Sequence, residues 1–62
     1  MEVKDFLNKM LNIGDSVIFI SNNEFYKGTV SHFTKYKVAV MFGDYDGAIK
    51  CAYKDHNKLI KI

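Results

Sequence analysis

Two histidines, one cysteine and a short acidic run are the side chains of this sequence that could perform chemistry. His32 and His56 lie far apart and Cys51 is the single cysteine, so the four closely spaced ligands of a structural zinc site are missing. Asp44-x-Asp46-Gly47 supplies two carboxylates of a calcium-binding loop but not its other ligands. We therefore expect no metal and no cofactor.

Covalent and acid–base catalysis are not indicated either. Cys51 alternates with Ile49 and Tyr53, a period typical of a strand, which predicts a small buried side chain rather than a nucleophile. The sequence shows no Ser–His–Asp arrangement, no phosphate-binding loop and no pair of carboxylates placed for acid–base work. We predict that the protein is not an enzyme and has no catalytic residues.

The aromatic side chains, nine in 62 residues, exceed what one small core requires. Phe6, Phe19 and Phe42 fall on faces that we expect to be buried. Five others lie at or near expected strand ends and loops, and we predict that they bind a partner: Phe25, Tyr26, Phe33, Tyr36 and Tyr45. An aromatic groove for a peptide would use such residues. The alternative is that they pack along the rim and pair across strands.

The basic residues are all lysines, and the net charge is only +2. Lysines interleaved with aromatic residues are typical of surfaces that bind single-stranded nucleic acid. The alternative, nucleic-acid-binding site comprises Lys35, Lys37, Lys50, Lys54 and Lys58. However, nearby aspartates would repel phosphate, and lysine lacks the planar fork that reads guanine. We therefore favour a protein partner, and we interpret the lysines as charges that keep the protein soluble.

The length and the single cysteine limit the organisation of the chain. Sixty-two residues form one domain, 1–62, with one core and a stability of about 3–9 kcal/mol. No apolar run approaches the roughly 20 residues of a membrane span, and early acidic residues argue against a secretion signal. A lone cysteine suits a reducing compartment. We expect a cytoplasmic protein that is a monomer or a weak homodimer.

The first eleven residues have the apolar spacing of an amphipathic helix. The apolar residues recur three and four apart, as on one helix face: Val3, Phe6, Leu7, Met10 and Leu11. The spacing therefore predicts a short N-terminal α-helix over residues 1–11. Strand residues Ile18 and Ile20 are apolar on the face away from Val17, and we expect the helix to cover them.

From residue 14 onward the apolar period changes to two. Alternation predicts strands over residues 16–21, 25–33, 37–42, 48–53 and 59–62, with turns at 22–24 and 43–47. Five short strands in so few residues favour a closed or nearly closed barrel over residues 14–62, because closure removes exposed sheet edges. Gly28, inside the second strand, predicts a sharp bend or a close backbone approach.

The order of these signals resembles an SH3-like small barrel of the KOW or Tudor-like type. The residues that support the resemblance are Gly14-Asp15-x-Val17, Lys27-Gly28-x-Val30, Val38-x-Val40 and Leu59-x-x-Ile62. The fold class that we predict is thus mainly β, a five-stranded SH3-like barrel with a short N-terminal α-helix. The resemblance implies a binding module, and its KOW-like form implies binding to nucleic acid or the ribosome.

Two further resemblances concern function. The arginine-free, lysine-rich composition resembles short bacteriophage proteins that disable a host protein, which implies a phage-encoded modulator or inhibitor acting in the host cytoplasm. The barrel size is also similar to that of the type II dihydrofolate reductases. Their Val-Gln-Ile-Tyr run is replaced here by residues 49–53, Ile-Lys-Cys-Ala-Tyr, so that activity is not expected. We predict a non-enzymatic protein-interaction module.

Overall fold

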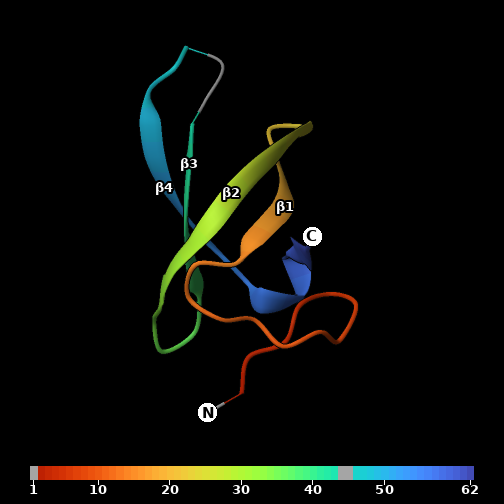
Figure 1. The fold of residues 1–62 in the computed structure, drawn as a ribbon. Coiled ribbons are helices and arrows are strands. Elements are labelled where there is room, and N and C mark those ends of the chain that lie inside the picture. Colours follow the sequence, from red (N-terminus) through yellow and green to blue (C-terminus); the bar gives the residue numbers. More distant parts are fainter. Residues whose placement is uncertain (1, 44–45) are drawn as a thin grey trace.

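Five antiparallel strands form a single sheet in the computed structural model, which describes residues 2–43 and 46–62 (Figure 1). The strands run in the order β4-β3-β2-β1-β5 across the sheet. Their bounds are β1 Ser16–Ser21, β2 Glu24–Phe33, β3 Val38–Gly43, β4 Ile49–Lys54 and β5 Ile60–Lys61. One turn of 3₁₀ helix, η1 at His56–Lys58, precedes β5. The prediction of a mainly β protein with five strands is confirmed.

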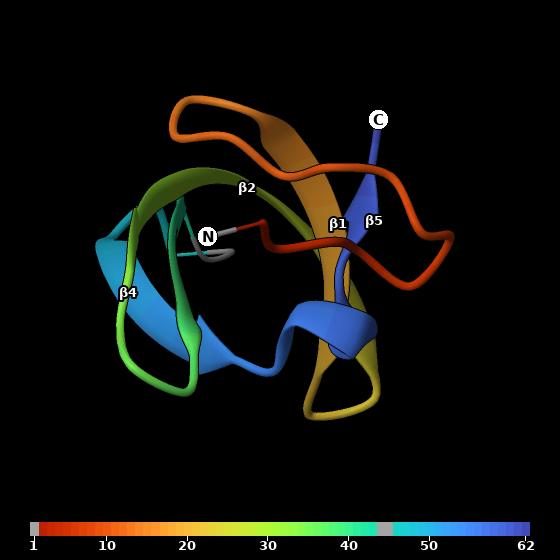
Figure 2. The same cartoon turned by 90° about the horizontal axis from the view of Figure 1, so that it is seen from below.

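The sheet is strongly curved, as the view from below shows (Figure 2), and its inner side holds a small apolar core. Alternation places one face of each strand inward, so that Val17 and Phe19 of β1 are buried while Ile20 is exposed. The buried cluster consists of Leu11, Val17, Phe19, Val30, Val38, Val40 and Leu59. Phe42 packs against this cluster, but Phe6 is 65% exposed, so its predicted burial is wrong.

The barrel prediction is not confirmed, because the sheet remains open between its two end strands. β5 has two residues and pairs only with β1, through Val17 with Lys61 and Ile18 with Ile60. In the part of the chain that the structure describes, no ladder joins β4 to β5. A two-residue strand that is already paired on one side offers too little backbone to close the sheet by hydrogen bonds.

Local backbone chemistry sets the β1–β2 hairpin. Asn22 and Asn23 both have positive φ angles, 52° and 63°, and connect the paired residues Ser21 and Glu24. A two-residue loop with positive φ at both positions matches the right-handed twist of the strands, and asparagine tolerates that conformation. The predicted turn is confirmed at Asn22 and Asn23, whereas Glu24, which was predicted to belong to it, is the first residue of β2.

The predicted N-terminal α-helix is wrong, because residues 2–15 contain no helix and fold back as a narrow loop. The Asp5 N–H donates to the Lys9 carbonyl at 2.8 Å, and the Asn8 N–H donates to the Asp5 carbonyl at 3.1 Å. Asn8 has a φ of 65°, a left-handed conformation that a helix interior does not contain. Three-residue hairpin loops commonly end on a residue in this left-handed conformation.

The Asp5 carboxylate holds this loop onto the end of the sheet. One carboxylate oxygen accepts the Lys9 N–H at 2.7 Å and the other accepts the Lys61 N–H at 2.7 Å. The side chain is only 5% exposed. Burial acts to raise the pKa of this carboxyl, but the backbone N–H groups of Lys61 and Lys9 outweigh burial and lower the pKa. A charged, buried Asp5 therefore ties the N-terminal segment to β5.

The apolar residues of the N-terminal segment do not act as one stripe. Leu11 is buried and Val3 packs against the core, whereas Phe6, Leu7 and Met10 are exposed. The segment therefore lies across the end of the sheet (bottom of Figure 1) and does not cover Ile20, which is 57% exposed. The predicted covering of Ile18 and Ile20 is wrong.

Gly28 permits a close contact between β2 and β3, as the sequence predicts. A Cβ atom at this position would lie 2.5 Å from Val40 Cγ1 and 2.8 Å from the Met41 carbonyl oxygen. At Gly43, by contrast, an added Cβ atom would meet nothing within 4 Å.

Replacing Gly28 with alanine should lower the free energy of unfolding by about 1–3 kcal/mol, because the added methyl forces Val40 and the β3 backbone to shift. Gly43→Ala is the matched control and should change it by less than about 0.5 kcal/mol. Urea denaturation followed by circular dichroism measures both. Equal effects of the two variants would contradict the close approach at Gly28.

Asp5→Asn should lower the free energy of unfolding at pH 7 by about 1.5–3 kcal/mol, because the amide cannot accept both backbone hydrogen bonds as a carboxylate does. The fold lowers the pKa of Asp5, so its stabilisation is complete above the unfolded pKa near 3.8 and is lost as pH falls through the folded value. The acid-induced decrease in the urea midpoint should therefore be smaller in the variant. An identical pH profile for both proteins would contradict this role.

Candidate functional site

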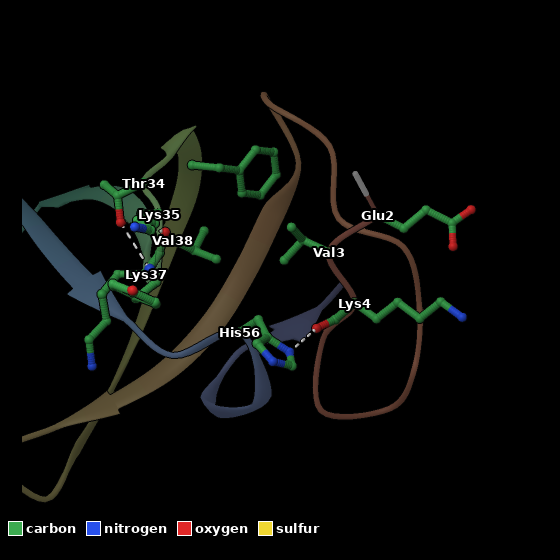
Figure 3. Close-up of a pocket in the computed structure, with 10 residues that line it drawn as sticks. Glu2, Val3, Lys4, Thr34, Lys35, Lys37, Val38 and His56 are labelled. Atoms are coloured by element: carbon green, nitrogen blue, oxygen red, sulfur yellow. Dashed lines mark hydrogen bonds between the residues drawn. The ribbon is translucent and has the colours of Figure 1, made fainter.

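A groove of about 190 Å³ opens where the N-terminal segment, the β2–β3 turn and η1 meet (Figure 3). Three separate parts of the chain contribute to it, namely residues 2–4, residues 33–38 and His56. Its lining residues are Glu2, Val3, Lys4, Phe33, Thr34, Lys35, Tyr36, Lys37, Val38 and His56. Val3 and Val38 face one another across the groove in Figure 3, so that its inner part is apolar.

The β2–β3 turn presents two side chains at the mouth of the groove. The Thr34 N–H donates to the Lys37 carbonyl at 2.8 Å, and the Lys37 N–H donates to Thr34 Oγ1 at 2.9 Å. These bonds fix residues 34–37 as a tight turn with Lys35 and Tyr36 at its tip. Tyr36 is 76% exposed, and Lys35 Nζ lies 5.4 Å from the centre of its ring. The turn thus displays a tyrosine beside a positive charge.

The opposite wall depends on a hydrogen bond between distant parts of the chain. His56 Nδ1 lies 2.7 Å from the Lys4 carbonyl oxygen, the contact drawn as a dashed line in Figure 3. Because a carbonyl oxygen only accepts, Nδ1 carries the proton and donates it in this bond. His56 is therefore a structural link between η1 and the N-terminal segment.

Lys37 is held at the edge of the groove by an ion pair. Its Nζ lies 2.8 Å from Asp55 Oδ1, and both side chains are about half exposed. The hydrogen bond from Lys37 lowers the pKa of the Asp55 carboxyl, so that this aspartate stays charged. The charge of Lys37 is thus partly neutralised, whereas Lys4 and Lys35 have no acidic partner among the ion pairs of the described residues.

The structure brings together only two of the predicted partner-binding residues that it describes. Phe33 and Tyr36 line the groove together. Tyr26 is half buried, with its ring 5.1 Å from that of Phe42, and belongs to the core edge. Phe25 is exposed on the outer face of β2, opposite Ile20 of β1. Tyr45 lies outside the described residues.

The predicted nucleic-acid-binding lysines are divided in a similar way. Lys37, Lys54 and Lys58 line a second hollow of about 450 Å³, together with Ile20, Tyr53 and Asp55. Lys54 Nζ also lies 5.6 Å from the ring centre of Phe19. Lys35 borders the groove, and Lys50 pairs with Phe42 in the β3–β4 ladder. The five lysines therefore do not form one continuous surface.

The histidines and the cysteine are not brought together. His32 packs its ring against Tyr53, with ring centres 6.3 Å apart, while His56 lies in the groove wall. Within residues 2–43 and 46–62, no three metal-ligating side chains are grouped. Cys51 is exposed, so its predicted burial is wrong, because β4 is an end strand whose outer face nothing in the described chain covers.

The sequence interpretation missed the contribution of Val3, Lys4 and His56 to the groove. The sequence pattern predicts a helix at Val3, and it considers His56 only as a metal ligand that lacks the partners of a zinc site. The spacing of Asp5 and Asn8 is the signal that indicates the loop, since aspartate favours the first position of a turn and asparagine tolerates positive φ. Nothing local in the sequence indicates the contact between His56 and Lys4.

Comparison with known proteins places the chain in a family. No curated protein and no solved structure matches it. The described residues contain no helix with the length and hydrophobicity of a bilayer-spanning segment. A family model with the description "Domain of unknown function (DUF7205)" matches residues 3–62, a range that includes the whole sheet and most of the groove. The chain therefore belongs to the DUF7205 family.

Proposed function

We propose that the protein is a non-catalytic interaction module that binds an acidic, apolar segment of a partner protein in the groove beside Tyr36. The observation on which this rests is the 76% exposure of a tyrosine that a hydrogen-bonded turn holds at the mouth of an apolar groove. Rigid exposed tyrosines supply contact area at low entropic cost and are enriched at binding hot spots. Cross-strand pairing does not account for a side chain at the tip of a turn.

The chemistry of the groove favours a particular ligand. Val3, Phe33 and Val38 provide an apolar interior with room for one anchoring side chain. Three lysines and one glutamate stand around it, so that the rim is net positive: Lys4, Lys35, Lys37 and Glu2. A segment with a large apolar residue flanked by carboxylates complements both features.

The proposal also includes a fold relationship and a class of partner. We infer that the curved sheet is an open variant of the SH3-like arrangement, supported by β5 lying beside β1 after one turn of 3₁₀ helix. The resemblance to short bacteriophage proteins favours a bacterial host protein as the partner. Binding would then modulate or inhibit that protein in the host cytoplasm.

Peptides selected from a random display library on the full chain should be enriched in a large apolar residue next to aspartate or glutamate. Tyr36→Ala should weaken the binding of a selected peptide by about tenfold or more, as measured by isothermal titration calorimetry, because truncation of a central aromatic commonly costs more than 1.4 kcal/mol.

The matched control is Tyr53→Ala, since this tyrosine is also exposed but lies outside the groove. It should leave the peptide affinity unchanged. Equal losses in both variants, or selected peptides without acidic residues, would show that the groove is not the binding site.

One observation favours nucleic acid as a second candidate function. Lys37, Lys54 and Lys58 line the second hollow together with Tyr53, which is 56% exposed. A base can stack on such a ring while the ammonium groups contact phosphates, as in surfaces that bind single strands. Asp55 lies in the same hollow and pairs with Lys37, which leaves mainly Lys54 and Lys58 for phosphate.

If this second function holds, the affinity for a single-stranded oligonucleotide should fall with rising salt, with a logarithmic slope of about −0.7 per phosphate contact. Lys58→Gln should reduce that slope by about one contact, whereas Lys27→Gln, on the outer face of β2, should not. Fluorescence anisotropy across a salt series measures both. Binding that is absent at 150 mM salt, or a slope that Lys58→Gln leaves unchanged, would exclude nucleic acid at this hollow.

A further inference from the structure

The outer edge of β4 is an exposed apolar feature that takes no part in the groove. β4 is one end of the sheet, opposite β5. Its outward-facing residues are strongly exposed, Ile49 to 76% and Tyr53 to 56%, with the exposed Cys51 between them. Met41, paired with Cys51, extends the same apolar face onto β3. End strands of this kind are templates for pairing with another strand.

The hydrogen-bonding pattern shows which backbone groups β4 presents at this edge. Both backbone groups of Val30 bond to the chain at residues 14 and 15, so they point away from β3. Since hydrogen-bonded and non-hydrogen-bonded pairs alternate, Met41 bonds toward β2 and its partner Cys51 points away from β3. By the same alternation, Ile49, Cys51 and Tyr53 direct their N–H and C=O groups outward from the sheet.

We propose that β4 pairs antiparallel with β4 of a second copy of the chain, centred on Cys51, so that the two sheets join into one. A two-fold pairing that keeps equivalent faces together pairs five residues of β4 when it is centred on Cys51 or Ala52, and only three when it is centred on Lys50 or Tyr53. Lysines decide among them, because like charges placed directly opposite destabilise a strand pair.

Only one of the two registers that pair five residues separates the lysines. A pair centred on Lys50 places that lysine opposite its own copy, and a pair centred on Ala52 places Lys50 opposite Lys54. The pair centred on Cys51 places Lys50 opposite Ala52 and Lys54 opposite Ala48. On the outer face it aligns Ile49 with Tyr53, an aliphatic–aromatic pair of the kind that stabilises sheets. The β4 sequence is thus self-complementary in this register.

This surface is distinct from the groove. Residues 2–4, the β2–β3 turn and η1 form the groove at one end of the sheet. The outer edge of β4, by contrast, is the side of that strand that faces away from its neighbour β3. The test of the dimer is therefore independent of the test of peptide binding. Of the two registers that pair five residues of β4, the lysines permit one and oppose the other, which favours a second copy over an arbitrary strand.

Sedimentation equilibrium of the full chain should show a reversible monomer–dimer equilibrium. Two double variants test the register, because both remove the same apolar pair. Ile49→Lys with Tyr53→Lys places like charges opposite one another and should weaken the dimer by about tenfold or more relative to Ile49→Lys with Tyr53→Glu, which places opposite charges there. Circular dichroism establishes that both variants are folded.

Cross-linking tests the centre of the pairing. In a hydrogen-bonded antiparallel pair the two Cys51 Cα atoms would lie about 5.5 Å apart, so a short bis-maleimide should join two wild-type chains efficiently. Moving the thiol one residue, with Cys51→Ser and Ala52→Cys, should reduce the yield severalfold. A chain that is monomeric at every concentration, or a dimer that is indifferent to the charge signs at positions 49 and 53, would overturn the proposal.

Discussion

The buried carboxylate of Asp5 is the interaction on which the arrangement of this chain depends. It accepts hydrogen bonds from the N–H groups of Lys9 and Lys61, which lie at opposite ends of the sequence. The Lys61 ammonium adds an ion pair with Asp15 at 3.2 Å and a hydrogen bond to the Met10 carbonyl. The buried charge of Asp5 is costly when it loses a hydrogen-bond partner. These contacts therefore hold the two residues of β5 in place.

The same anchor produces the groove. With Asp5 held at β5, the preceding residues must cross the open end of the sheet, where Val3 reaches the core and the Lys4 carbonyl meets His56. A chain of 62 residues has few side chains to fill its core, so an irregular segment completes it at that end. The segment covers the core incompletely beside the β2–β3 turn, and the space that remains is the groove.

The sequence predicts the strands and turns well because their determinants are local. Alternation identifies β1 to β4, and the paired asparagines identify the first hairpin. It fails at residues 2–11, where the spacing of Val3, Phe6 and Leu11 fits a helix. The carboxylate of Asp5, satisfied by a residue more than fifty positions away, stabilises a loop there instead. Tyr36 and Phe33 were predicted as partner-binding residues from their places near strand ends, whereas the contact of His56 with Lys4 has no local signal.

Lysine residues lie beside both of the exposed apolar regions for which we propose a partner. Lysines four residues apart on β4, Lys50 and Lys54, oppose the self-pairing registers centred on Lys50 and on Ala52, as charged residues do at natural sheet edges. Lys35 similarly lies beside the exposed ring of Tyr36, with its Nζ 5.4 Å from the ring centre. Under both proposals, these ammonium groups favour partners that place carboxylates or small neutral residues opposite them, because like charges repel. Under both proposals, the nine lysines of the 62 residues would therefore favour some partners over others, in addition to providing charge for solubility.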